Sequence, residues 1–283
     1  MSLSHRARTN SGAVAAERDV VGVVPAAGRA TRISPLPCSK EIYPVGFRSG
    51  LETGAVRPKA ACTYLLERMC FASITKVYVV LRDGKWDIPA YLRGGEQLGI
   101  ELAYLIADLP FGAPYTVGRA VPFVRNATVA FGFPDMIYRS EDIFARLLER
   151  QAVRPADILL GLFPVEAGRQ VDILDVQDDG RVRQVVVQPP DSRLRSTWGV
   201  AVWTPSFSEF IDAYVRDHAA TAAAEPEPSM GSVIQQAIEA GLRVEAIRVC
   251  DTPYVDIGTP EGLLEAHRRA IRCDEHGRNE HTT

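Results

Sequence analysis

The chain has 283 residues, a net charge of −3 and a pI near 6.0, and 46% of its residues are hydrophobic. This length is sufficient to bury a substantial core in one large α/β domain or two small ones. The small net charge argues against a nucleic-acid-binding surface as the main function, although it is compatible with a local basic pocket for phosphates.

The cysteine and histidine content argues against several kinds of site. Five cysteines are scattered without a CxxC pair, which is typical of a reduced cytoplasmic protein and predicts neither a disulfide framework nor a zinc site. Only five histidines are present, so the sequence offers few residues from which a histidine metal site or a Ser/His/Asp triad could be built. No apolar run approaches the ~20 residues of a membrane span. We expect residues 1–19 to be a flexible leader and 273–283 a frayed tail.

Strands and helices alternate through the first half of the chain. Residues 20–24 form a β-branched run that predicts a buried strand followed by a tight loop, Pro25 to Gly28. The alternation predicts an α/β protein with a three-layer αβα architecture and a mostly parallel central sheet, with ligands bound beyond the carboxyl ends of the strands. Further strands are expected at 76–81, 102–106 and 128–131, helices at 61–72 and 140–151, and a loop at 47–56.

The second half continues as part of the same domain, which we expect to span residues 20–272. Residues 171–187 are typical of a β-hairpin, because Asp178-Asp179-Gly180 is a turn sequence between two apolar runs. Strands are also expected at 158–163, 199–203 and 244–249, helices at 207–215, 232–240 and 259–271, and an exposed loop at 219–228.

A loop with the composition of a phosphate site follows the first strand. Ala26, Ala27 and Gly28 allow close approach of the backbone, whose N–H groups favour an anion. Arg32 offers a guanidinium fork to phosphate oxygens, and Lys40 offers a point charge. Chemistry at a nucleoside triphosphate needs such groups, because charge must be spread while pyrophosphate departs. Taken alone, the segment is equally compatible with a structural turn carrying two solvated cations.

This segment resembles the sugar-1-phosphate nucleotidyltransferases, which include glucose-1-phosphate thymidylyltransferases and uridylyltransferases. Their pattern is G-x-G-T-R-[LM]-x-P-[LT] followed by K-x-x-x-P-V, and Ala30 departs from it at the second glycine. The resemblance implies that Arg32 polarises the α-phosphate and that Lys40 holds phosphate oxygens in the transition state. The matching residues are Gly28, Thr31, Arg32, Pro35, Leu36, Lys40, Pro44 and Val45.

Two aspartates far apart in the sequence each follow an apolar run, and such carboxylates on separate strand ends can jointly hold Mg²⁺. Ordinary roles are also open, since Asp135 can cap a loop and Asp256 can support the helix that begins near Pro260. The sequence GFPD, ending at Asp135, takes the place of the family's strand-terminal GD. Residues 254–266, YVDIGTPEGLLEA, resemble its W-x-D-x-G-T-P-E-x-L-x-x-A signature. The resemblance therefore implies magnesium binding by Asp135 and Asp256, with Asp135 also contacting the nucleotide.

The resemblance is weaker where the two substrates would be recognised. It places Gly199 and Gln188 beside the sugar, with Gln188 at a position where the family carries lysine, and Asp172 is a candidate on the same side. Residues 108–120 resemble the loop that reads a pyrimidine, which makes Gly112 and Tyr115 candidate nucleotide contacts. Arg119 stands where family members often carry glutamine.

These observations lead to a first hypothesis and two alternatives. The first is an Mg²⁺-dependent enzyme that forms an NDP-sugar and pyrophosphate from a pyrimidine NTP and a sugar-1-phosphate. The loss of lysine at Gln188 leaves open a cyclitol phosphate or a phosphonate as acceptor. The three departures, Ala30, Arg119 and Gln188, leave open a nucleotide-binding paralogue without turnover. Neither nucleic acid nor membrane is an expected partner, and a homo-oligomer is possible because members of the family often self-associate.

Overall fold

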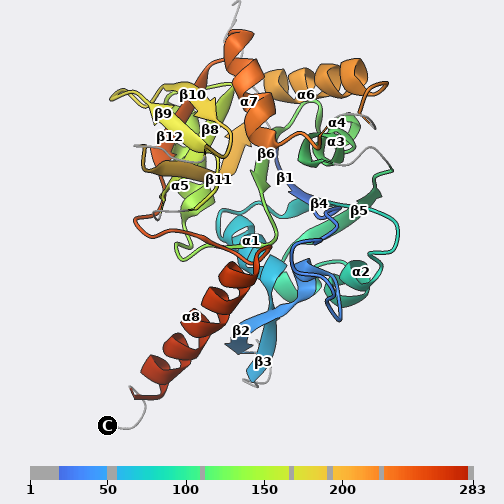
Figure 1. The fold of residues 1–283 in the computed structure, drawn as a ribbon, viewed down its shortest axis with the longest axis vertical. Coiled ribbons are helices and arrows are strands. Elements are labelled where there is room, and N and C mark those ends of the chain that lie inside the picture. Colours follow the sequence, from blue (N-terminus) through green and yellow to red (C-terminus); the bar gives the residue numbers. More distant parts are fainter. Residues whose placement is uncertain are drawn as a thin grey trace, which may run out of the picture.

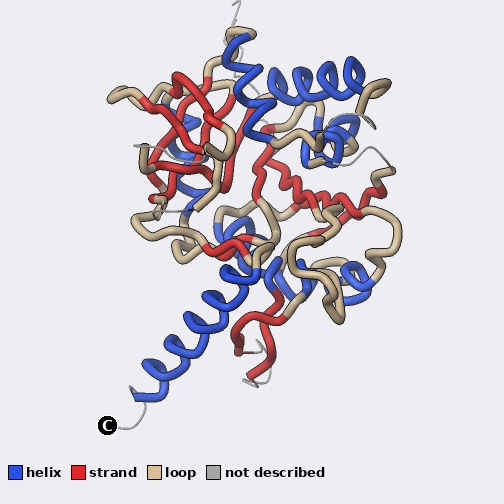
Figure 2. Tube along the Cα trace, in the orientation of Figure 1, coloured by secondary structure: helices blue, strands red, loops and turns tan. Residues whose placement is uncertain are grey.

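A computed structural model describes residues 19–49, 56–108, 112–165, 169–189, 194–222 and 226–279. The expected leader therefore lies outside the described residues, except for Asp19. Within these ranges a large twisted sheet is covered by helices on both faces (Figures 1 and 2), which confirms the predicted three-layer αβα architecture. No helix in the described ranges is both long enough and apolar enough to cross a membrane.

The central sheet is mostly parallel, as predicted. Four neighbouring strands at one side of the sheet are parallel. Their order is β5 (Glu101–Ile106), β4 (Lys76–Leu81), β1 (Val20–Pro25) and β6 (Thr128–Gly132). β11 (Ser196–Trp203) runs antiparallel to β6 and to β8 (Ile158–Pro164), and β12 (Val244–Arg248) lies parallel to β8. The predicted hairpin is formed by β9 (Ile173–Val176) and β10 (Val182–Val186), and β9 pairs with β11.

Two hydrophobic clusters fill the space between the sheet and its helical layers. One lies beneath α1 (Ala61–Phe71), α2 (Asp87–Leu92) and α5 (Ile143–Val153). The other lies beneath α3 (Ala113–Gly118), α4 (Val121–Val124), α6 (Pro205–His218) and α7 (Met230–Glu239). The apolar residues of α5 illustrate the cause, since Ile143, Phe144 and Leu147 recur at helical spacing and are all fully buried. Short 3₁₀ turns are present at η1 (Lys40–Ile42) and η2 (Glu96–Leu98).

The structure differs from the sequence-based expectations in three segments. The expected loop at 47–56 is instead flanked by an antiparallel pair, β2 (Pro44–Ser49) and β3 (Val56–Ala60), while residues 50–55 lie outside the described part. The helix expected from Ser140 begins only at Ile143. The Ser140 hydroxyl donates a hydrogen bond to the Asp142 carboxylate and does not cap the helix. The last helix, α8 (Pro260–Asn279), continues through most of the expected frayed tail, packs against β2 and projects from the body (Figure 1).

Candidate active site

The candidate site lies beyond the carboxyl ends of β1 and β6, as expected for a parallel sheet. There β7 (Met136–Ile137) pairs antiparallel with β13 (Val255–Asp256), so that Asp256 lies opposite Met136. The Ile257 N–H also donates a hydrogen bond to the Asp135 carbonyl, at 3.0 Å. This local pairing brings together the two aspartates that the sequence separates widely.

Lys40 and Asp135 form an ion pair at the centre of the site. The Lys40 Nζ atom lies 2.5 Å from the Asp135 Oδ2 atom, and the two side chains are only 14% and 12% exposed. Burial alone would lower the pKa of Lys40 and raise that of Asp135. The attraction between them reverses both effects, so that the pKa of Lys40 is raised and the pKa of Asp135 is lowered. Both groups are therefore charged near neutral pH.

Asp256 and Arg32 lie beside this pair. The Gly258 N–H donates to Asp256 Oδ1 at 2.7 Å, and Arg32 Nη2 lies 3.9 Å from Asp256 Oδ2. A methyl group added at Gly258 would lie 2.9 Å from Asp256 Oδ1, 3.2 Å from Arg32 Nη2 and 3.3 Å from Asp135 Oδ2. One position thus faces both carboxylates and the guanidinium. Burial, together with the charge of Asp135, raises the pKa of Asp256.

The departure at Ala30 has a structural consequence. Ala30 adopts a positive φ of 56°, in the left-handed region where a side chain is strained and glycine is not. This explains why the pattern that the loop resembles has glycine there. The chain retains the glycine-like turn with alanine, and Arg32 remains exposed beside the site.

A cavity of about 150 Å³ lies on the β1 side of the Lys40–Asp135 pair. Three of the candidate nucleotide-binding residues, Ala27, Gly28 and Gly112, line it. Gly112 has φ 119°, and a side chain there would meet Pro228 at 3.0 Å, so this position requires glycine. Ala26 is not among the lining residues, because it is buried in the core and its N–H extends the sheet to the Val80 carbonyl.

The segment expected to read the base is partly helical rather than a loop. Within α3, Ala113 and Thr116 line the cavity, whereas Tyr115 is buried with its ring centroid 6.4 Å from that of Tyr214 in α6. Arg119 does not line the cavity, since its Nε donates to the Ile106 carbonyl at 3.0 Å. Tyr115 therefore does not face this cavity, whereas its helical neighbours Ala113 and Thr116 do.

A second cavity, of about 360 Å³, lies on the other side of the same ion pair. Asp172 and Gln188, the candidates for the acceptor side, line it, and so does Arg32, which the resemblance assigned to the triphosphate. Gly199 lies behind its wall, where its carbonyl accepts a hydrogen bond from the Tyr138 hydroxyl. The neighbouring Trp198 lines the cavity instead. Because Lys40 and Asp135 line both cavities, the two spaces adjoin at these residues.

Sequence reasoning missed a buried ion pair beneath the first cavity. Lys85 Nζ lies 2.6 Å from Glu41 Oε1, and both side chains are almost fully buried. Burial is the largest influence on both groups and shifts their pKa values toward the neutral forms. Glu41 and Arg82 line the cavity, so they belong to the site. Only the position of Glu41 next to Lys40 could have suggested a role, and nothing in the sequence indicates its partner.

Comparison with known proteins agrees with this geometry. The protein has an α/β fold with two cavities that adjoin at Lys40 and Asp135. Residues 21–272 match the family described as Nucleotidyl transferase, and the chain belongs to that family.

Two curated relatives are similar over most of this chain. It is 26% identical over 259 residues to the low-salt glycan biosynthesis nucleotidyltransferase Agl11 of Haloferax volcanii. The matched region covers 88% of this chain and 66% of that relative. The chain is also 26% identical over 237 residues to the glucose-1-phosphate thymidylyltransferase of Streptomyces antibioticus, with 81% and 63% covered. The chain thus spans about two thirds of the length of the curated relatives that it matches.

One solved structure confirms the fold. It is the crystal structure of a Bacillus anthracis protein described as a glucose-1-phosphate thymidylyltransferase, in complex with sucrose. The TM-score is 0.73 over 89% of this chain and 95% of that protein, at 16% sequence identity. At this identity the likeness establishes the architecture alone.

Proposed function

We propose that this chain transfers a nucleotidyl group from an NTP to a sugar-1-phosphate, forming an NDP-sugar and pyrophosphate. The observation that carries the proposal is the meeting of two cavities at Lys40 and Asp135. One cavity has the small-residue loop suited to a triphosphate, lined by Ala27, Gly28 and Gly112. The other, lined by Arg32, Asp172 and Gln188, has room for a phosphorylated acceptor.

The reaction needs no nucleophile from the protein, because the acceptor phosphate is already ionised. One of its oxygens forms a bond to the α-phosphorus, and the bond from that phosphorus to the bridging oxygen of the β-phosphate breaks. Pyrophosphate leaves with the electron pair. Lys40 and Arg32 stabilise the charge that develops on the phosphate oxygens, and the two cavities hold the reacting atoms in line. Glu41 and Lys85 act behind Lys40 by fixing the position of η1.

Asp135 and Asp256 have the chemistry and arrangement to hold Mg²⁺. One position faces both carboxylates, and two carboxylates completed by substrate phosphates and water are a common way to bind this ion. Within the described residues no cluster of three or more histidine, cysteine, aspartate or glutamate side chains offers a site without substrate. When bound, the ion would neutralise phosphate charge and orient the reacting groups.

We also propose a pyrimidine NTP as the donor and the cytoplasm as the location. The name of the Streptomyces relative supports the first proposal, and the free thiols of Cys38, Cys62, Cys70 and Cys250 support a reducing compartment. Self-association stays a prediction from the family resemblance.

Pyrophosphate release tests the proposal when the full chain is given each of the common NTPs with glucose-1-phosphate, in the presence and absence of Mg²⁺. We expect release only when NTP, acceptor and metal are all present, with the highest rate for a pyrimidine NTP. Nucleotide binding without release, for every phosphorylated sugar, cyclitol phosphate and phosphonate tried, would identify a paralogue without turnover and contradict the proposal.

A further inference from the structure

The charges lining the second cavity are unevenly distributed. Its four acidic side chains are Asp135, Asp172, Glu227 and Asp256, and its two cationic ones are Arg32 and Lys40. Each cation already has an acidic neighbour, since Lys40 pairs with Asp135 and Arg32 lies near Asp256. Among the described residues, neither Asp172 nor Glu227 forms an ion pair with a lysine, arginine or histidine. Glu227 lines both cavities and Asp172 lines the second alone, so acidic side chains extend from the junction of the cavities to Asp172.

Asp172 is the most informative of these side chains. It precedes β9, and its carboxylate lies against the first turn of α7, where Gly231 leaves no room for a side chain. Its Oδ1 atom is buried without a hydrogen-bond partner among the described residues. Burial raises its pKa to about 6, although hydrogen bonds from the Gln188 backbone and the Trp198 side chain act in the opposite direction. The contacts within the protein thus offset only part of the free-energy cost of burying this charged carboxylate.

Aromatic side chains also lie around the second cavity. Trp198 and Tyr254 line it, and Phe133 lies with its ring centroid 5.8 Å from that of Trp198. Aromatic faces attract cations, and they do so more strongly in a desolvated site. Gln188 lines this region without adding a positive charge, and its φ of 41° holds the backbone in a left-handed turn beside Asp172. An acidic group among aromatic rings is suited to a positively charged nitrogen.

We infer that the acceptor carries a positively charged nitrogen in addition to its phosphate, with the phosphate at the Arg32 and Lys40 end and the nitrogen at the Asp172 end. This inference rests on the proposed nucleotidyl transfer and specifies its acceptor. An amino sugar 1-phosphate and a phosphorylated amino alcohol share this chemistry.

A neutral sugar is the competing explanation, because a hydroxyl can donate a hydrogen bond to a carboxylate. A hydroxyl satisfies the oxygen but leaves the negative charge of Asp172 uncompensated. A protonated nitrogen supplies a positive charge and a charge-assisted hydrogen bond, which is stronger than a neutral one. A quaternary nitrogen donates no hydrogen bond but supplies the charge and is attracted to the aromatic faces.

The test compares two matched pairs of acceptors with the full chain. Glucosamine-1-phosphate and glucose-1-phosphate differ in one charged nitrogen, as do phosphocholine and its carbon isostere, 3,3-dimethylbutyl phosphate. For each acceptor, kcat/KM is measured by pyrophosphate release, and Kd is measured by calorimetry with a non-hydrolysable NTP analogue present. The wild type is compared with Asp172→Asn, which keeps the shape of the side chain and removes its charge, and with the exposed control Glu209→Gln.

We expect the charged member of at least one pair to be preferred about tenfold or more in the wild type and in Glu209→Gln. In Asp172→Asn this preference should fall to about twofold or less, through loss of activity or affinity toward the charged member alone. The preferred pair then distinguishes an amino sugar from an amino alcohol. Equal or better use of the neutral members, or an equal effect of Asp172→Asn on both, overturns the inference while nucleotidyl transfer stands. If no acceptor yields pyrophosphate, the proposed function fails and the Kd ratios decide the inference separately.

Discussion

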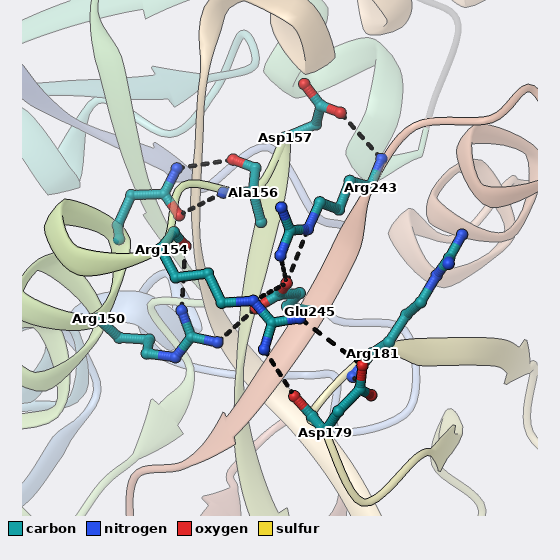
Figure 3. Close-up of polar contacts among 9 residues, drawn as sticks. Arg150, Arg154, Ala156, Asp157, Asp179, Arg181, Arg243 and Glu245 are labelled. Carbon is teal, nitrogen blue, oxygen red and sulfur yellow. Dashed lines mark hydrogen bonds and ion pairs between the residues drawn. The ribbon is translucent and has the colours of Figure 1, made fainter.

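Two clusters of charged side chains lie at opposite ends of the central sheet and are built differently. At the amino ends of β8 and β12, Glu245 is fully buried and contacts three arginines (Figure 3). Arg150 Nη2 lies 2.5 Å from Glu245 Oε2, Arg154 Nε lies 3.1 Å from Oε1, and Arg243 donates from both Nε and Nη2 to Oε1. Arg154 also reaches Asp179 in the β9–β10 turn, at 3.6 Å. These contacts join α5, β12 and the hairpin.

The cluster at the carboxyl ends is less complete. Lys40 and Asp135 pair with each other, but Arg32 is 65% exposed and its contact with Asp256 is long, at 3.9 Å. Asp172 and Glu41 each keep a buried oxygen without a hydrogen-bond partner in the described part of the chain. The charge of Glu245 is satisfied by the protein itself, whereas these two oxygens of the cleft, which is formed by the two adjoining cavities, have no partner among the described residues. The candidate site is therefore indicated by buried oxygens without a hydrogen-bond partner, and not by the number of its charged side chains.

The largest expected effect comes from removing a carboxylate of the cleft. Asp256→Asn should lower kcat/KM for pyrophosphate release by about 10³-fold or more, because the proposed metal loses one of its two protein ligands. The melting temperature should not fall, since burial and the charge of Asp135 raise the pKa of Asp256 and so disfavour its ionised form in the folded protein. The exposed Asp251→Asn is the matched control. Full activity in Asp256→Asn would show that the cleft does not use this carboxylate.

The Glu245 cluster should give the opposite result. Glu245→Gln should lower the free energy of unfolding in urea by about 3–5 kcal/mol, because three arginines lose a buried counter-charge. Below the unfolding transition its kcat should match that of the wild type, since the cluster is remote from both cavities. Glu209→Gln, at an exposed position, should stay within about 0.5 kcal/mol. A large fall in kcat of the folded Glu245→Gln protein would break the distinction between the two clusters.

The smallest expected effect concerns stability and pH at Asp172. The pKa of this group is about 6 in the folded protein and 3.8 as its ordinary value, so the folded state binds the proton more tightly. This stabilising contribution is complete below pH 4 and is lost as the pH rises through 6. Asp172→Asn should therefore gain stability relative to the wild type between pH 4 and 7.5, by at most about 3 kcal/mol. Melting temperatures of both proteins at several pH values measure this, and parallel curves would contradict it.

The sequence predicts the parts of the site that depend on local order along the chain. Composition and spacing indicate the strand before Ala27 and the helix after Asp256, whereas the resemblance of their motifs to the family singles out Lys40, Asp135 and Asp256. The sequence does not predict which side chain of a segment faces the cavity. Tyr115 and Gly199 lie in the expected segments, but helical rotation in α3 and the pleat of β11 direct their neighbours into the cavities.

The sequence does not predict the ion-pair partners that meet across the fold. Lys85 meets Glu41, and three arginines meet Glu245, through the packing of elements that share no spacing pattern. The β2–β3 pair was missed for a related reason. Its glycine and serine content favours a loop, whereas the pairing arises with a positive φ at Gly46 and a shifted register between Pro44 and Phe47.

The central claim is that the cleft, and not the Glu245 cluster, is completed by a metal-bound triphosphate. Calorimetric titration with a non-hydrolysable NTP analogue, with and without Mg²⁺, tests it most directly in the wild type, Asp256→Asn and Glu245→Gln. We expect Mg²⁺ to tighten binding at least tenfold in the wild type and in folded Glu245→Gln, and to have little effect in Asp256→Asn. Equal Mg²⁺-dependent tightening in all three proteins would contradict the account.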